Sequence, residues 1–185
     1  GRDTSFQNFM NIQTQTPVYI AEFADNQLTV GLKGVSNEET EQRVDAIVRL
    51  FCCLHGRDVF IKYYSKRLST RLLNKTSISR EAEEAMLNKL KVECGLNTVN
   101  KMSQMFTDIQ LSKDLQTEYD SKHGALVAGI SFQAEILTNG TWPVDTTITC
   151  NIPPSMKQCT DKFTLFYKNK HKNRNLNWVW QVGTV

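Results

Sequence analysis

Few side chains in this sequence are spaced for nucleophilic or metal chemistry. The 185 residues include five cysteines and three histidines, but these form no CxxC pair and no spacing typical of a zinc site. Cys94, directly before Gly95, could act as a nucleophile only beside a base. No histidine lies at a position in the sequence that suggests it could serve as that base. Asp108 and Asp114 flank Ser112, but such residues at helix ends ordinarily serve as caps or solvated charges. We find no catalytic constellation and expect reduced, buried thiols, no metal and no cofactor.

The composition is that of an ordinary globular protein. Apolar residues make up 40% and charged residues 22% of the chain, which excludes a disordered protein. The net charge of +3 is too mild for a dedicated nucleic-acid binder. The longest apolar runs have about five residues, whereas a membrane span needs about 20. The first residues show neither a Met nor a secretory pattern, so we expect an excised fragment of an intracellular protein.

Basic residues gather on one predicted helix over residues 57–75. This stretch contains a single acid, Asp58, which we expect to cap the helix. One interpretation of the basic residues is a solvated face beside acidic helices. The other is a docking face for an acidic protein, with nucleic acid as a third option. The candidate docking face consists of Lys62, Lys66, Arg67 and Arg71.

A second basic segment, residues 168–174, lies close in sequence to Tyr167, Trp178 and Trp180. Basic residues interleaved with aromatic rings can bind single-stranded nucleic acid through charge and stacking. However, Trp178 and Trp180 share one face of a predicted strand, which favours a place in the core. The alternative function raised here is a nucleic-acid-binding α+β protein that uses residues 167–180.

Helical spacing dominates residues 1–120 and predicts a bundle like a four-helix bundle. Ser36 and Glu39 form a capping box at the start of one helix, and Ser79 caps another that Gly95 ends. The main helices are expected over residues 36–56, 57–75, 79–95 and 99–109, with 112–119 extending the last helix or starting another.

Residues 121–185 are predicted to form a small α/β part with an incomplete sheet, which makes the fold class α+β. Strands are expected over 130–137, 146–152 and 176–180, and a helix is expected over 156–167. An unfinished sheet has an edge of unpaired N–H and C=O groups, onto which another chain can add a strand. Apolar side chains such as Ile136 and Trp178 would supply specificity at that edge.

Residues 58–73, which read DVFIKYYSKRLSTRLL, resemble the cullin signature DVFxxFYxxxLAxRLL. Further motifs similar to those of cullins follow in the family's order over residues 79–95, 105–115, 137–143 and 153–178. Ser69 stands where the family has Ala, and Asn173 and Asn175 stand for a Gly and a Lys, as in a divergent member. The divergent cullin-like subunit of the anaphase-promoting complex is the alternative within this class, but the well-kept motifs favour an ordinary cullin.

The resemblance implies a non-catalytic scaffold fragment of a cullin–RING ubiquitin ligase, found in the cytoplasm and nucleus. In that family a RING-box protein threads a strand into the α/β sheet and brings a ubiquitin-conjugating enzyme. N-terminal repeats, expected to be missing here together with the C-terminal winged helix and its modified lysine, bind a substrate receptor. Neither nucleic acid nor membrane is an expected partner. We expect strand addition by the RING-box protein at Phe132, Ile136, Trp142, Trp178 and Trp180.

Overall fold

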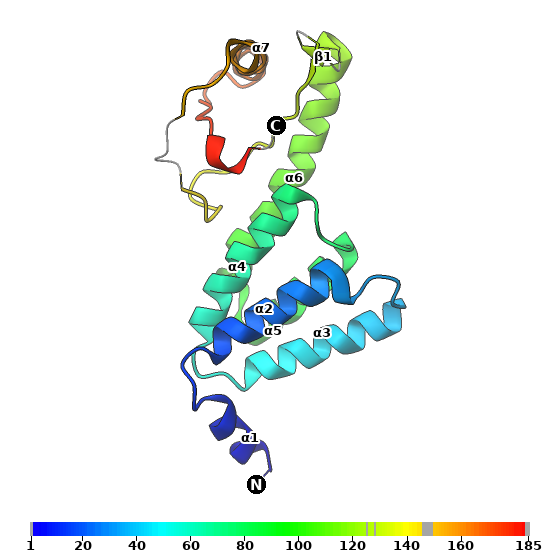
Figure 1. Ribbon diagram of the computed structural model, residues 1–185, viewed down its shortest axis with the longest axis vertical. Helices are drawn as coiled ribbons and strands as arrows, with labels where there is room; N and C mark the ends of the chain where they lie inside the picture. The colour runs from blue at the N-terminus through cyan, green and yellow to red at the C-terminus, as the bar shows by residue number, and fades with distance from the viewer. Residues whose placement is uncertain (1, 125, 128, 146–149, 184–185) are drawn as a thin grey trace. The chain divides into compact units, whose positions relative to one another are not determined.

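The computed structural model describes residues 2–124, 126–127, 129–145 and 150–183, and the chain divides into two compact units (Figure 1). Unit 1 comprises Gly1–Phe106 and Thr138–Pro143, and unit 2 comprises Thr107–Leu137 and Val144–Val185. The long helix α6 (Leu96–His123) begins in unit 1 and ends in unit 2. The predicted α+β class is confirmed, because a helical part precedes a part that mixes helix and strand.

The helices of unit 1 begin where the sequence provides caps. α3 (Asn37–Cys52) follows Ser36, whose hydroxyl accepts a hydrogen bond from the Glu39 N–H at 3.2 Å. α5 (Arg80–Cys94) follows Ser79, whose hydroxyl accepts one from the Ala82 N–H at 3.0 Å. Both serines cap their helices as predicted, since a serine oxygen satisfies a backbone donor of the first turn that has no partner within the helix. The reciprocal bond of the predicted capping box is not formed in the described structure, because the Glu39 carboxylate accepts from Arg43 instead, at 2.6 Å.

The end of α5 and the start of α4 (Arg57–Asn74) differ in how far the sequence predicted them. Gly95 ends α5 with φ +83°, a conformation that residues with a Cβ rarely adopt. The expectation that Asp58 caps α4 is wrong, because the N-cap is Gly56, two residues earlier, and the helix starts at Arg57. Asp58 instead lies in the first turn, where a carboxylate interacts favourably with the helix dipole.

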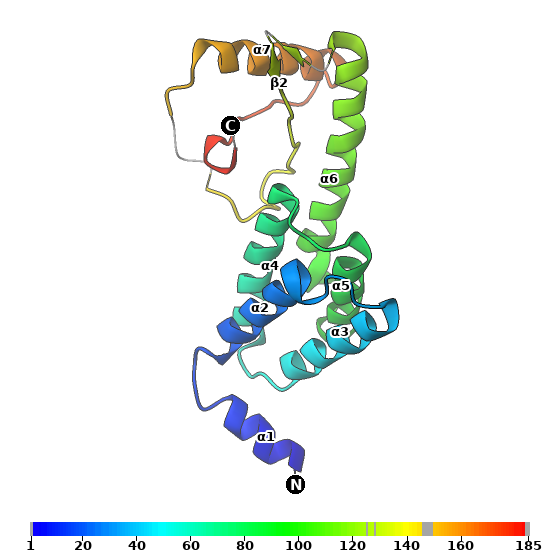
Figure 2. The same cartoon turned by 45° about the vertical axis from the view of Figure 1, so that its right-hand side comes forward.

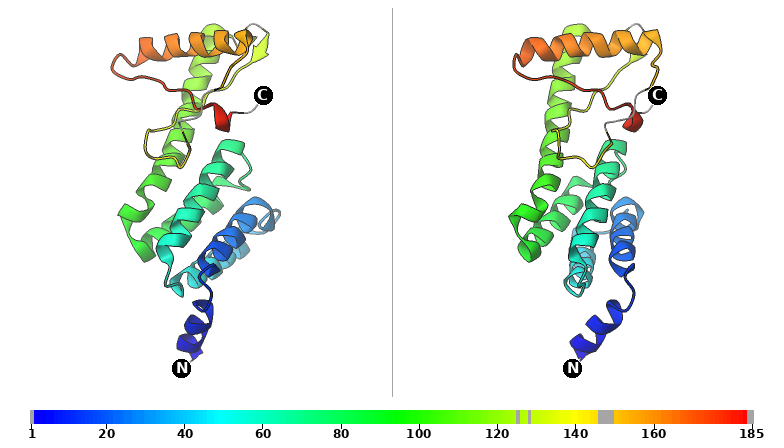
Figure 3. Two further views of the ribbon diagram at one scale, coloured as in Figure 1. Left: turned by 60° about the vertical axis from the view of Figure 1, so that its left-hand side comes forward. Right: turned by 90° about the vertical axis from the view of Figure 1, so that its left-hand side faces the viewer.

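Two helix pairings organise the core of unit 1. α2 (Thr16–Asn26) packs mainly on α4 (Figure 3). α3 packs mainly on α5. The N-terminal α1 (Arg2–Met10) precedes them, and a π-helical turn (Gln27–Gly31) follows α2. Burial of one apolar stripe per helix is the main force that holds such a bundle. The fully buried side chains include Val44, Phe51, Phe60, Tyr64, Met86 and Met105.

Unit 2 is built on the second part of α6. α7 (Pro154–Lys170) crosses the C-terminal end of α6 (Figure 2), and the two helices meet through the rings of Tyr119, Phe163 and Phe166. β1 (Leu126–Val127) and β2 (Ile130–Ser131) form an antiparallel pair, and a 3₁₀ turn (Trp180–Val182) follows near the end of the described chain. The helix predicted over 156–167 is confirmed.

The strands predicted from period-two alternation are largely wrong. Of the strand expected over 130–137, only the two residues of β2 pair with another strand in the described part of the chain. The expected strand over 176–180 is irregular, and Trp180 opens the 3₁₀ turn.

The strand expected over 146–152 falls partly outside the described residues, which omit 146–149, and 150–152 are irregular. The alternation of apolar and polar residues indicates which side chains are buried, but it does not indicate which backbone segments form hydrogen bonds with one another. In unit 2 the alternating side chains pack on α6 and α7 instead of belonging to a wider sheet.

Candidate partner-binding surfaces

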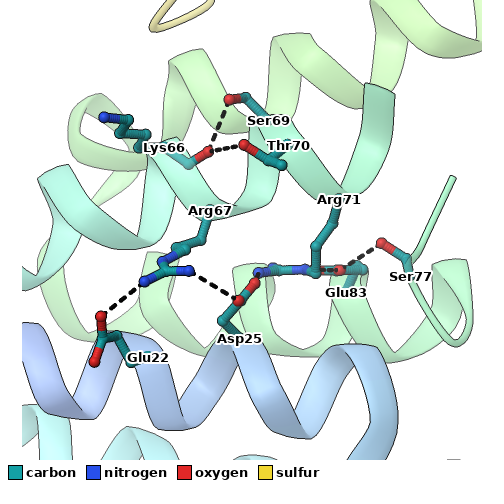
Figure 4. Close-up of polar contacts among 9 residues, drawn as sticks. All are labelled: Glu22, Asp25, Lys66, Arg67, Ser69, Thr70, Arg71, Ser77 and Glu83. Atoms are coloured by element: carbon teal, nitrogen blue, oxygen red, sulfur yellow. Dashed lines mark hydrogen bonds and ion pairs between the residues drawn. The ribbon is translucent and has the colours of Figure 1, made fainter. Parts of the chain in front are cut away.

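The basic residues of α4 divide into an exposed set and a buried arginine. Lys62 and Lys66 are exposed, one helical turn apart. Arg67 is 43% exposed and pairs with Glu22 at 2.7 Å and with Asp25 at 3.6 Å, both on α2 (Figure 4). These three residues remain available as a docking face, although Arg67 already has acidic partners within the unit.

Arg71 does not belong to that face, which corrects the prediction. Its side chain is 2% exposed, and its Nε and Nη2 donate to the two oxygens of Glu83 at 2.7 and 2.9 Å (Figure 4). Nη1 donates to Asp25 at 2.5 Å, and the Ser77 hydroxyl also donates to Glu83, at 2.7 Å. The arginine thus joins α2, α4 and α5 through bidentate and charge-assisted bonds.

The electrostatics of this cluster suit a structural tie and not proton transfer. Burial is the largest single influence and lowers the pKa of Arg71. The hydrogen bonds that Arg71 donates to Glu83 and Asp25, together with the surrounding negative charge, outweigh burial and raise the arginine's pKa. Burial, followed by the negative charge of Glu83, raises the pKa of Tyr64, whose ring lies 5.4 Å from the guanidinium carbon. At neutral pH the arginine therefore stays charged and the phenol stays neutral.

Helical spacing could have predicted the burial of Arg71. Phe60, Tyr64 and Leu68 follow one another at four-residue steps on the buried stripe of α4, and Arg71 is the next position on that stripe. The sequence interpretation took its charge as a sign of exposure. A long charged side chain on a buried stripe requires a buried partner of opposite charge, and Glu83, in the first turn of α5, is that partner.

In unit 2, two side chains of α6 bind the backbone that follows β2. Gln116 donates from its amide to the Phe132 carbonyl at 2.9 Å and accepts from the Ala134 N–H at 3.1 Å. One helical turn earlier, the Ser112 hydroxyl accepts from the Ile136 N–H at 2.7 Å. Alternate residues of the segment 132–136 are therefore held as a neighbouring strand would hold them, but by a helix.

The aromatic residues proposed for partner binding in unit 2 gather on one cluster. Phe132 and Trp178 each contact the buried Phe163 ring, at centroid distances of 5.9 and 6.1 Å. Trp178 donates from its indole N–H to the Thr164 hydroxyl at 3.2 Å and stacks on Trp180 at 5.8 Å. Together with Ile136, which packs against the same cluster, these residues form a partly buried apolar surface.

Trp142 does not join them, which corrects the grouping in the prediction. It is 6% exposed and belongs to unit 1. There it lines a cavity of about 340 Å³ together with Ile61 of α4 and Met102 of α6. Its role in the described structure is to anchor the loop 138–143 on the bundle.

The nucleic-acid alternative is not favoured by the placement of the basic segment. Lys170 pairs with Glu118 of α6, and Tyr167 is 4% exposed. The Trp178 ring packs on Phe132 and Phe163. Base stacking requires free aromatic faces beside basic groups, and most of these rings are engaged inside unit 2.

The thiols of Cys52 and Cys94 are not activated for nucleophilic catalysis. Burial and a hydrogen bond to Glu93, at 3.2 Å from the sulfur, raise the pKa of Cys52 to about 11. Burial also raises the pKa of Cys94, which donates to the Leu90 carbonyl. Both thiols are protonated at neutral pH and are therefore poor nucleophiles.

The described residues contain neither a cluster of metal ligands nor a membrane-spanning helix. Within the ranges described above, no three His, Cys, Asp or Glu side chains gather as metal ligands would. No described helix has the length and hydropathy to cross a bilayer.

Comparison with known proteins gives matches in both units. A model of the cullin alpha solenoid domain matches residues 1–116, and one of the cullin alpha+beta domain matches residues 136–185. The chain is 37% identical to Cullin-3B of Arabidopsis thaliana over 183 residues and 39% identical to Cullin-3 of Dictyostelium discoideum over 183 residues. It is 37% identical to human Cullin-4A over 182 residues. These matches cover 97% to 99% of this chain but only 24% to 25% of the relatives, so the chain spans about a quarter of their length. The chain belongs to the cullin family.

Proposed function

We propose that this chain is part of the non-catalytic scaffold of a ubiquitin ligase in the cytoplasm and nucleus. Unit 2 binds a RING-box protein, which in turn holds a ubiquitin-conjugating enzyme. A substrate receptor binds elsewhere on the full-length protein. Membership of the cullin family, with matches in both units, supports this assignment.

The observation that carries the proposal is the segment 132–136. The β1–β2 ladder stops at Ser131, while Ser112 and Gln116 continue to hold alternate backbone groups on one side of the segment. A strand of the RING-box protein extends this ladder, and its main-chain hydrogen bonds supply affinity. Phe132, Ile136 and Trp178 supply apolar contacts that select the partner.

The proposed mechanism is geometric. The chain contributes no acid, base or nucleophile to ubiquitin transfer. It raises the effective concentration of a substrate lysine near the charged conjugating enzyme by fixing distance and orientation. Helices tied by buried pairs such as Arg71–Glu83 suit a scaffold that must keep its geometry.

The exposed basic face of α4 is a second docking surface in this proposal. Lys62, Lys66 and Arg67 attract an acidic tail of the conjugating enzyme and increase its rate of association. Exposure of the two lysines and the absence of Arg71 from this face define which positions matter.

Co-purification with a RING-box protein tests the main proposal. The complete chain should form a stable pair, a variant that lacks residues 126–185 should lose it, and the Lys66→Glu variant should keep it. Retention of the RING-box protein by the truncated chain would overturn the assignment to unit 2. A titration with single-stranded oligonucleotides across salt concentrations tests the alternative, which requires a steep salt dependence.

A further inference from the structure

Unit 2 contains an open groove of about 590 Å³ between the C-terminal end of α6 and one face of α7. Its lining combines basic groups with an apolar floor. The residues that matter here are Glu118, Lys122, Lys162, Leu165, Phe166 and Lys170. None of them belongs to the segment 132–136 or to the basic face of α4.

The groove has an excess of positive charge. Lys122 and Lys170 both pair with Glu118, so two ammonium groups share one carboxylate. Lys162 is exposed, and no described residue pairs with it. The two paired lysines lower the pKa of Glu118 to about 2, which keeps the carboxylate ionised and leaves the three lysines with a single counter-charge.

The apolar part of the groove lies among these lysines. Leu165 is 63% exposed, while the neighbouring Phe166 is 7% exposed and closes the floor. The Lys122 ammonium lies 5.6 Å from the Phe166 ring centroid, a cation–π arrangement that holds it at the rim. Lys162, Leu165 and Phe166 lie at three- and four-residue steps, on one face of α7.

We propose that this groove binds an acidic peptide segment of a partner protein that carries one apolar side chain. The carboxylates of the segment pair with the lysines, and the apolar side chain covers Leu165. Charge complementarity selects an acidic occupant. Protein is favoured over nucleic acid because Phe166 is too buried for a base to stack on it.

Fluorescence anisotropy with the complete chain tests this proposal. The probe is a labelled peptide of Asp and Glu residues around one central leucine. Lys162→Glu should weaken its binding about fivefold or more, and Leu165→Ser should remove most of the preference for this peptide over one with a central alanine. Lys157→Glu is the matched control, because Lys157 is an exposed lysine of α7 outside the groove.

The proposal expects Lys157→Glu to bind the probe within about twofold of the unchanged chain. It is overturned if the probe does not bind, if both lysine variants weaken binding equally, or if the leucine and alanine peptides bind equally to the unchanged chain. It is also overturned if a single-stranded oligonucleotide of equal charge binds more tightly and is equally sensitive to Lys162→Glu. Circular dichroism of each variant establishes that the fold is retained.

Discussion

At the scale of single residues, Arg71 shows how one charge can tie three helices. Its guanidinium lies between Glu83, which has a fully buried side chain, and Asp25, which is 22% exposed. Removal of one partner from such a pair leaves an uncompensated buried charge, which costs far more than the pair itself contributes.

We therefore predict that Arg71→Met lowers the free energy of unfolding by about 3–5 kcal/mol, measured by urea denaturation of the chain. Arg67→Met, which removes a half-exposed arginine from the same helix, should cost at most about 1 kcal/mol. A double change, Arg71→Met with Glu83→Leu, should recover much of the loss, because no buried carboxylate of that pair remains. Equal effects of the two single changes would contradict the buried tie.

Glu118 gives a prediction for pH dependence. Lys122 and Lys170 lower its folded pKa to about 2, below the ordinary value of 4.5. A lowered folded pKa means that the stabilisation is fully present above pH 4.5 and is lost as the pH falls towards 2. Glu118→Gln should therefore lower the melting temperature at neutral pH, and the difference from the unchanged chain should shrink in this acidic window. Asp161→Asn, at an exposed acid of α7 that lies outside the groove and pairs with no described lysine, should not reproduce that trend.

At the scale of elements, the helices were predictable and the strands were not. Ser36, Ser79 and Gly95 mark helix ends through local chemistry that a sequence displays directly. The backbone after β2 depends instead on Ser112 and Gln116, about twenty residues earlier in the chain. Nothing in an alternating apolar pattern distinguishes a strand paired with a strand from one held by polar side chains of a helix. Helical spacing could have predicted the burial of Arg71, but the sequence did not identify its partner, because Glu83 lies on another helix.

The segment 132–136 supplies the corresponding prediction. Gln116→Ala leaves the buried Ala134 N–H without its acceptor, which should cost about 1–3 kcal/mol of stability. Hydrogen exchange should show faster exchange at the Ala134 amide. Gln110→Ala, at an exposed position of the same helix, should change stability by no more than about 0.5 kcal/mol. Unchanged exchange at Ala134 would show that the Gln116 bond does not hold the segment.

The basic face of α4 is tested by charge reversal in the full-length protein. Lys62→Glu with Lys66→Glu should slow recruitment of the conjugating enzyme several-fold and flatten its salt dependence, because the exposed positive charge is removed. Stopped-flow association rates at two salt concentrations measure this. Lys157→Glu, on α7, serves as the control for net charge. An unchanged rate and salt dependence in the double variant would remove the face from the mechanism.

At the scale of the whole molecule, the proposed function is that of a scaffold that acts through what it binds. The thiols of Cys52 and Cys94 have raised pKa values and are therefore weak nucleophiles. Its helical unit is held by buried stripes and the Arg71 tie. Unit 2 contains a short antiparallel ladder, β1–β2, which is where the proposal places the added strand of the partner. A rigid helical unit and a separate binding unit are what the geometric mechanism proposed for this chain requires.

Hydrogen-exchange mass spectrometry of the chain, alone and with a RING-box protein, tests the central claim most directly. Strand addition predicts strong new protection over residues 130–138, with little change in the α4 segment 57–74. Formation of a stable complex with protection confined to α4, or with none over 130–138, would contradict the account.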